Sequence, residues 1–333
     1  HKLQGHGLQI ALLEARPRLG GRIRTQYDET EAPLEMGATW LGKKHQHLVR
    51  LLEELELPIF PQRLGDHAVY EPISTSPPQL VVLPPNDEPS FRIAGGNSAL
   101  IQALADRLGG IDVKLNYPVQ ALEASETGVK VVSDAGILHA QKVVSTLPPR
   151  LFVEQIQTGP DLPQVVKALA QHTHTWMGES IKIALTFAEP FWREEGMSGT
   201  VFSSVGPVTE LYDHSDVTDV RYALKGFLNG AYFSLDKAGR QELILNQLRR
   251  YFGARVDSFL SYAEAVWRHE PYTFADYEGH ILPHQHNGHP MFRQPFMDGR
   301  LFLAGSETAP QFPGYMDGAV QSAEWVVEQL KLK

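Results

Sequence analysis

The chain has 333 residues, of which 42% are hydrophobic and 21% are charged, a composition typical of soluble proteins with one large core or two smaller ones. The 30 basic and 39 acidic residues give a formal net charge of −9, which argues against nucleic acid and against an anionic membrane as partners. There is no cysteine, so disulfides and thiolate metal sites are excluded. No secretory signal or membrane-spanning apolar run is visible, and a cytoplasmic location is expected.

The first predicted strand, over residues 8–13, ends at an acid and is followed by two glycines. An acid at the end of the second strand of a dinucleotide-binding fold binds ribose hydroxyls, so Glu14 is a candidate for that role, the alternative being a solvated strand end. Gly20 and Gly21 allow a ligand to approach the backbone closely, and Arg22 can bind a phosphate.

The phosphate loop of such a fold is missing from the sequence. A G-x-G-x-x-G segment should precede the acid by about 20 residues, but Glu14 lies too close to His1 for this. Either a longer protein carries the segment before His1, which we favour because nothing else in the sequence looks decayed, or the chain is a truncated form. If the chain begins at His1, its dinucleotide binding should be badly weakened. Residues 1–7 read as the last turn of a helix and the turn after it.

The middle of the chain alternates between glycine-rich, helical and short strand segments. A glycine-rich segment covers 35–42, an amphipathic helix is predicted over 47–57, and the prolines of the irregular region 58–89 make a long helix there unfavourable. A second helix starts at Asn97 or Ser98, either of which is a fair N-cap. Short strands separated by glycine turns are then predicted at 113–115, 119–122, 129–132 and 143–146.

The second half of the chain mixes strands and helices. A short helix over 162–169 precedes a strand over 179–187, in which isoleucine and leucine alternate with other residues at a period of two. The other predicted elements are strands over 222–233, 263–268 and 301–304, a helix over 241–252 and a helix from 315 onwards.

The stretch Gly299–Val327 combines a buried strand, a glycine, a loop with two prolines and the start of a helix. A strand, a glycine turn and a helix amino end together present free backbone N–H groups to an anionic or carbonyl-bearing ligand. Gly314 and Gly318 would let a flat ligand approach the backbone. The alternative is a C-terminal helix that only packs against the core.

Four segments of the sequence resemble the flavin-containing amine oxidase family, which includes monoamine and polyamine oxidases. The C-terminal flavin-binding sequence of that family is similar to AGSETA at 304–309 followed by GYMDGA at 314–319. EARPRLGGR at 14–22 and ESIKIALTF at 179–187, which is followed by EPFWR, resemble the same family. The resemblance extends over most of the chain, with gaps at the start and at 58–90, where the substrate domain looks shortened.

The resemblance implies an α/β fold of two interleaved domains. One is a Rossmann-like FAD-binding domain, here without its first strand and phosphate loop, and the other is a smaller α+β substrate domain. The expected FAD-binding segments are 1–48, 91–160 and 268–333, and the expected substrate-domain segments are 49–90 and 161–267.

The resemblance also implies which residues contact FAD. The expected contacts are Glu14, Ala15, Arg16, Gly21, Arg22, Gly37, Ala38, Thr39, Trp40, Val119, Trp267, Gly305, Ser306, Glu307, Tyr315, Met316 and Ala319. Val119 would hold the adenine through its backbone, and the N–H of Met316 would lie near the isoalloxazine. Asp276 stands where some mammalian members attach the flavin through cysteine, so FAD is expected to be bound non-covalently.

Three residues are candidates for the chemistry. By the resemblance, Lys182 would lie near flavin N5, where burial lowers a lysine pKa and a charge helps reduced flavin to react with O2. The alternative is a lysine on the solvent face of a half-exposed strand. Tyr277 and Tyr315 would form the two walls of an aromatic cage that steers the amine, the alternative being two ordinary half-buried tyrosines.

The implied reaction is oxidation of a small-molecule amine to an imine, which hydrolyses to an aldehyde or ketone, with O2 reduced to H2O2. A flavin desaturase or protoporphyrinogen-type oxidase is an alternative that Lys182 and the tyrosine pair disfavour. A flavin-binding relative without turnover is a second alternative. No arginine is obviously placed to hold an amino-acid carboxylate. The histidine-rich loop at 280–289 contains no carboxylate, so no metal site is expected.

Overall fold

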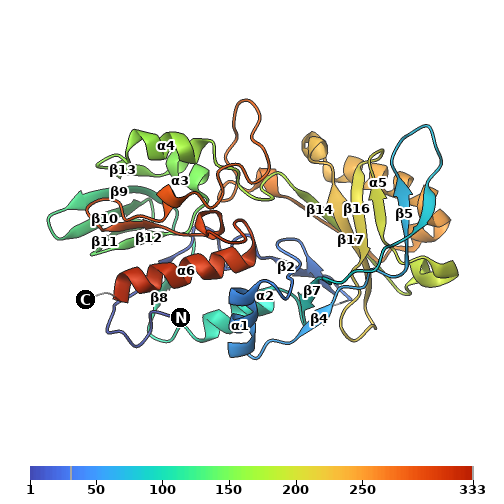
Figure 1. The fold of residues 1–333 in the computed structure, drawn as a ribbon, viewed down its shortest axis with the longest axis horizontal. Coiled ribbons are helices and arrows are strands. Elements are labelled where there is room, and N and C mark those ends of the chain that lie inside the picture. Colours follow the sequence, from blue (N-terminus) through green and yellow to red (C-terminus); the bar gives the residue numbers. More distant parts are fainter. Residues whose placement is uncertain (31, 332–333) are drawn as a thin grey trace.

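The computed structural model describes residues 1–30 and 32–331, which form two lobes that Figure 1 shows side by side. The helices are α1 (Gln46–Glu54), α2 (Ser98–Asp106), α3 (Pro149–Gln155), α4 (Gln164–Gln171), α5 (Lys237–Phe252) and α6 (Met316–Lys331). The strands are β1 (Ala11–Leu13), β2 (Thr25–Tyr27), β3 (Pro33–Glu35), β4 (Ile59–Pro61), β5 (His67–Glu71), β6 (Gln79–Val82), β7 (Phe91–Ile93), β8 (Asp112–Lys114), β9 (Val119–Ser125), β10 (Gly128–Ser133), β11 (Gly136–Ala140), β12 (Val143–Ser145), β13 (Gln157–Gly159), β14 (Ile181–Phe187), β15 (Val201–Ser203), β16 (Val208–Asp213), β17 (Tyr222–Leu228), β18 (Ser261–Val266) and β19 (Leu301–Leu303). Within the described residues, no helix has the length and apolarity needed to cross a bilayer.

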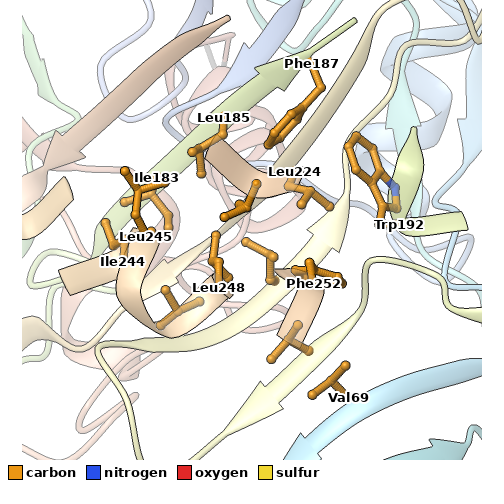
Figure 2. Packing of buried hydrophobic residues seen from close by; sticks show 14 of the residues in the cluster. Val69, Ile183, Leu185, Phe187, Trp192, Leu224, Ile244, Leu245, Leu248 and Phe252 are labelled. Atoms are coloured by element: carbon orange, nitrogen blue, oxygen red, sulfur yellow. The ribbon is translucent and has the colours of Figure 1, made fainter. Parts of the chain in front are cut away.

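One lobe is built on a seven-stranded sheet in the order β18-β14-β17-β16-β15-β5-β6. Ile183 and Leu185 of β14 point to one face, where they pack with Leu248 and Phe252 of α5 and with Trp192, as Figure 2 shows. Period-two alternation places the residues between them on the opposite face of the sheet. Part of that face is lined by alanines, and Leu34 of the hairpin of β2 and β3 packs with them.

The second lobe contains an antiparallel meander of β9, β10 and β11, with β13 parallel to β9. Its core joins Phe152 of α3, Val166 of α4 and Leu301 of β19. Helix α4 therefore packs in the lobe that also holds α3 and α6 (Figure 1), and we propose that the boundary of the substrate domain lies after α4 rather than at residue 161.

Two short parallel pairs, β1 with β8 and β12 with β19, stand apart from the larger sheets. Parallel strands normally lie inside larger sheets that are covered on both faces. Here Leu8 is 48% exposed, and Val113 of β8 is 37% exposed. The described residues contain neither a strand that joins the two pairs nor a G-x-G-x-x-G loop.

The sequence-based elements are largely found, with several differences. The structure adds elements that the sequence does not predict, namely α3, β2, β3, β7, β13, β15 and β16. The region 58–89, expected to be irregular, contains β4 and the hairpin of β5 and β6. Strand β5 joins the large sheet by pairing in parallel with β15. Strand β11 was not expected. Residues 1–7 form turns rather than the end of a helix.

Candidate active site

Lys182 is the second residue of β14 and is only 4% exposed. Its ammonium donates hydrogen bonds to the carbonyl oxygen of Gly37 and, at 3.3 Å, to Thr39 Oγ1. Burial lowers the pKa of Lys182 to about 8, although the nearby Glu35 carboxylate opposes this shift. The alternative of a solvent-facing lysine is therefore wrong.

The loop Gly37–Trp40, which holds Lys182, is fixed from three sides. The N–H of Ala38 donates to Arg22 O at 2.9 Å, and Trp267 Nε1 donates to Met36 O at 2.7 Å. Asn97 Nδ2, at the start of α2, donates to the carbonyl oxygens of Ala38 and Thr39 at 2.8 and 3.2 Å. This loop is therefore the point where the amino-terminal segment, α2 and the large sheet meet.

Arg22 and Glu307 join the amino-terminal and carboxy-terminal segments. The guanidinium donates two parallel hydrogen bonds to the carboxylate, at 2.6 and 2.7 Å, and Glu307 is fully buried. Burial opposes both charges, but the pairing raises the pKa of Arg22 and lowers the pKa of Glu307 relative to their ordinary values. Arg22 also donates to Ser306 Oγ at 3.0 Å and to Trp176 O at 3.1 Å.

In the turn after β19, backbone without a side chain lies close to the start of α6. Gly305 has φ +105°, and a Cβ there would lie 2.9 Å from Thr146 O, so a side chain would not fit without a shift. Its N–H is bonded to Ser322 Oγ of α6 at 2.8 Å. Met316 opens the helix at 9% exposure, and the Ala319 N–H returns to Tyr315 O at 3.2 Å.

Glu14 and Arg16 occupy the end of β1. Glu14 Oε1 accepts the N–H of Arg16 at 2.8 Å, while the Arg16 side chain turns toward Glu270 at 3.2 Å and Thr273 at 2.6 Å. Ala15 lies between them, and Gly21 has φ +55° in the turn that precedes Arg22. Val119 opens β9, at a register shift opposite Ser133.

The two expected cage tyrosines have different neighbours. The Tyr315 ring is 5.6 Å from the ring of Trp176 and stacks with that of His284 at 5.9 Å, and His284 itself stacks on Trp176 at 3.8 Å. Tyr277 lies under the Arg150 guanidinium at 5.0 Å, in a small pocket. Among the ring pairs of the described residues, these two tyrosines do not contact each other.

The histidine-rich loop serves packing in this structure, because His284 is part of the aromatic stack. Across residues 1–30 and 32–331, no three His, Asp or Glu side chains come together as a group that could hold a metal ion.

The structure adds a residue that sequence reasoning missed, Lys225 of β17. It is fully buried, and its ammonium donates to Thr39 Oγ1 at 2.8 Å, the same hydroxyl that Lys182 contacts. The ammonium lies 4.3 Å from the centre of the Trp40 ring and 4.5 Å from that of Phe227. The only sequence feature that points to Lys225 is the period-two pattern of a strand at residues 223–227 (ALKGF).

The residues present fit the flavin end of FAD better than its diphosphate end. Near the loop and the start of α6, the buried Asn97 Oδ1 and Asp317 Oδ2 lack a hydrogen-bond partner among the described residues and are free to bind an added group. The backbone beside Gly305 leaves room for close approach. Arg22, by contrast, is already paired with Glu307, and the described chain supplies no glycine-rich phosphate loop.

Comparison with known proteins agrees with this geometry. A family model described as flavin containing amine oxidoreductase matches residues 1–76 and 73–330. The chain is 30% identical over 249 residues to a probable flavin-containing monoamine oxidase A of Dictyostelium discoideum, covering 73% of this chain and 53% of that protein. It is 28% identical to an L-amino acid dehydrogenase of Synechocystis sp. (strain ATCC 27184 / PCC 6803 / Kazusa), covering 69% of this chain and 49% of that one.

The chain thus spans about half the length of the curated relatives it matches. A solved structure of a putrescine oxidase bound to putrescine is similar in fold, with a TM-score of 0.85 at 23% identity, over 100% of this chain and 95% of that one.

Proposed function

The chain belongs to the flavin-containing amine oxidoreductase family, and from this premise we propose that it carries the catalytic site of an FAD-dependent amine oxidase. The observation that carries the proposal is the buried Lys182, held at the loop Gly37–Trp40 where the amino-terminal segment, α2 and the large sheet meet. Burial of a lysine costs free energy, and perturbed buried groups of this kind are found preferentially at functional sites.

FAD would be bound non-covalently, with its ribose near Glu14 and its flavin near Met316. Glu14 has a carboxylate oxygen for ribose hydroxyls, Ser306 and the backbone at Gly305 would lie along the ribityl chain, and Met316 would offer its N–H to the flavin. Trp267, Thr39 and Trp40 would form the wall between the cofactor and the large sheet. The absence of cysteine from the sequence supports non-covalent binding.

When bound, flavin accepts the two electrons of the amine Cα–N oxidation and passes them to O2, which takes up two protons to become H2O2. The protein has to orient the amine, exclude bulk water and hold a charge beside the reacting centre. We assign the last role to Lys182 and the steering of the amine to Tyr277 and Tyr315. The imine product leaves and is hydrolysed by water to a carbonyl compound and an amine or ammonia.

Family membership does not by itself fix the substrate or the electron acceptor, because the relatives' names include a monoamine oxidase, a putrescine oxidase and an L-amino acid dehydrogenase. The buried position of Lys182 favours an oxidase over a flavin desaturase. A flavin-binding relative without turnover is the second candidate.

The test uses purified protein in two forms, the chain as given and a longer chain that also carries a glycine-rich phosphate loop. Each is mixed with FAD, and the visible spectrum is recorded without oxygen while amines are added. We expect bleaching of the flavin band by an amine and recovery, with H2O2, on admitting air. A yellow protein that no amine bleaches would favour the non-catalytic candidate, and a longer chain that stays colourless would refute the flavin assignment.

A further inference from the structure

Lys225 and Lys182 form a pair on one face of the large sheet. In the antiparallel register of β14 and β17, Lys182 is opposite Phe227 and Ala184 is opposite Lys225, so the two lysines are diagonal neighbours. Both ammonium groups reach the hydroxyl of Thr39, and the Phe227 ring lies within 5.0 Å of the Lys182 ammonium and 4.5 Å of the Lys225 ammonium. Lys225 therefore borders the centre assigned to the reaction.

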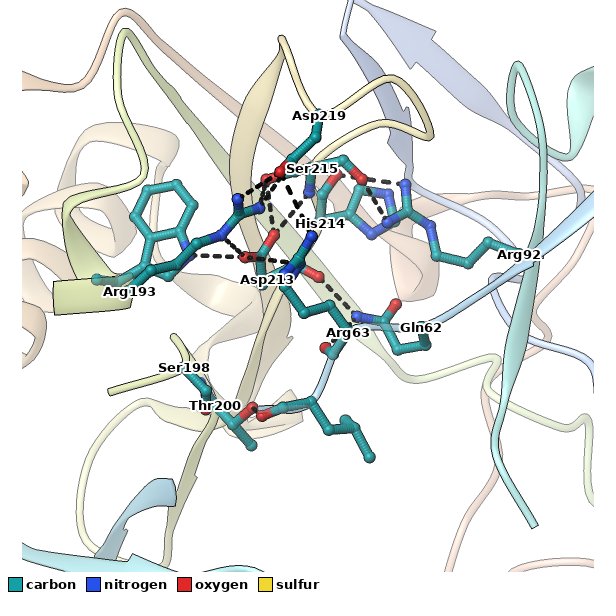
Figure 3. Close-up of polar contacts among 12 residues, drawn as sticks. Gln62, Arg63, Arg92, Arg193, Ser198, Thr200, Asp213, His214, Ser215 and Asp219 are labelled. Carbon is teal, nitrogen blue, oxygen red and sulfur yellow. Dashed lines mark hydrogen bonds and ion pairs between the residues drawn. The ribbon is translucent and has the colours of Figure 1, made fainter. Parts of the chain in front are cut away.

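The ammonium of Lys225 is enclosed by aromatic rings that are themselves fixed. Trp40 packs edge-on against Tyr212 at 5.1 Å, and its indole N–H donates to Gln62 Oε1 at 2.8 Å. Gln62 in turn donates to Asp213 O at 2.6 Å, within a polar network in which Arg193 binds the Asp213 carboxylate, as Figure 3 shows. The aromatic cage over the Lys225 ammonium consists of Trp40 and Phe227, and its Trp40 side is held in place by Tyr212 and Gln62.

The charge of Lys225 is not matched by a carboxylate. No carboxylate of the described residues accepts a hydrogen bond from it: Glu210 is engaged by the Tyr212 hydroxyl at 2.9 Å, and Glu35 by the backbone N–H of Asn97 at 2.6 Å. Burial and the charge of Lys182 lower the pKa of Lys225 well below its ordinary value. A structural role would be served as well by methionine, which fills the same space without a charge.

We propose that Lys225 and its aromatic cage form the distal part of the amine site and select amines whose other end carries a carboxylate, against diamines. This inference rests on the proposed function. A bound carboxylate would favour the protonated form of Lys225 against the burial that lowers its pKa, and would supply the partner that the ammonium lacks. A distal ammonium would find no such acceptor there and would be repelled by positive charge on either lysine. An unbranched alkylamine would bind the apolar ring faces with intermediate strength.

The test compares 4-aminobutyrate, butylamine and butane-1,4-diamine, with homologues of three to six carbons, in protein loaded with FAD. In the parent protein we expect kcat/KM for the best amino acid to exceed that for the best diamine by about tenfold or more. In Lys225→Met, the preference should fall to about threefold or less, through KM rather than kcat. Lys237→Met is the matched control, because Lys237 is exposed and also lies over a ring, that of Tyr262, at 5.5 Å.

A second measurement is independent of turnover. Calorimetric titration of butyrate should show binding to the parent protein and to Lys237→Met, and its loss in Lys225→Met, whose melting temperature should not fall. If amines are oxidised but diamines are preferred, or if Lys225→Met keeps the parent's preference, the inference is overturned and the oxidase proposal stands. If no amine is oxidised, the oxidase proposal fails. Lys225-dependent butyrate binding would then still support the anion site, and its absence would overturn it.

Discussion

Arg22 and Glu307 lie 285 residues apart in the sequence and form a bidentate ion pair, with N···O distances of 2.6 and 2.7 Å. The carboxylate also accepts the Ser306 hydroxyl at 2.9 Å and the Trp176 N–H at 3.2 Å. All its strong contacts are therefore inside the protein, and the pair ties the turn after β1 to the turn after β19.

Replacing Glu307 with glutamine should lower the free energy of unfolding by about 3 kcal/mol, because the largely buried Arg22 charge would lose its counter-ion. Urea denaturation measures this. Glu194→Gln is the control, since Glu194 pairs with Arg255 on the surface, where both side chains are well exposed, and should cost less than about 1 kcal/mol. Equal losses in the two variants would mean that the Arg22 charge is solvated.

The sequence predicts some parts of this site better than others, for physical reasons. Lys182 could be found because period two along a strand and a family resemblance coincide at one residue. Lys225 could not be found, because its segment shows no clear strand or helix pattern. Its place beside Lys182 depends on the register between β17 and β14, which is a long-range property. The sequence offers no obvious arginine for an amino-acid carboxylate, whereas the structure offers the buried Lys225.

Other differences have the same origin. Strand β5 joins the large sheet by pairing with the distant strand β15, which short-range pattern does not report. Strand β11, in contrast, pairs with the neighbouring strand β10 across a short turn. Asn97 was expected to cap α2 through its side chain, and it does precede the helix. Its amide instead bonds the loop Gly37–Trp40, so tertiary contacts replace the local cap.

Lys182→Met should slow the reaction of the reduced protein with O2 by about tenfold to a hundredfold, with a smaller effect on reduction by amine, because a positive charge stabilises the electron transfer to O2. In the parent protein this rate should fall as pH rises through about 8, where Lys182 loses its proton. The groups that face Lys182 are Gly37 O, Thr39, Glu35 and Lys225. Stopped-flow mixing with O2 at several pH values measures the rate, and a pH profile shared by the parent and Lys182→Met would contradict the assignment.

Glu35 should make stability depend on pH. Glu35 is 2% exposed and accepts the Asn97 N–H at 2.6 Å. Burial raises the pKa of its carboxyl to about 7, although its hydrogen bonds and the nearby positive charges oppose this shift. Between its unfolded pKa and about pH 7, the folded state holds a proton that the unfolded state has lost, so this group's contribution to stability falls as pH rises through this range.

Glu35→Gln should remove this dependence, because glutamine keeps the acceptor oxygen and does not titrate. Relative to the parent, the variant should gain about 1–3 kcal/mol in the free energy of unfolding between pH 5 and pH 8. Denaturation at a series of pH values measures the difference. Glu53→Gln, an exposed change on α1, should give a flat difference, and a flat difference for Glu35→Gln as well would show that its carboxylate is solvated.

Gly37 should be irreplaceable even by alanine. A Cβ there would lie 2.1 Å from Arg22 O and 2.6 Å from Arg24 N, both backbone atoms. This backbone is held to the loop, because Arg22 O accepts the Ala38 N–H and Arg24 O accepts the Gly37 N–H. Since neither can yield as a flexible side chain would, Gly37→Ala should push the loop away from Lys182 and destabilise the protein by about 2 kcal/mol or more. Gly42→Ala is the control, because its Cβ would meet only Lys44 Cγ at 3.7 Å, an ordinary contact. Thermal unfolding and FAD titration of both variants test this, and a Gly37→Ala protein with parent-like melting and FAD affinity would show that the loop is not held against Arg22 as the structure has it.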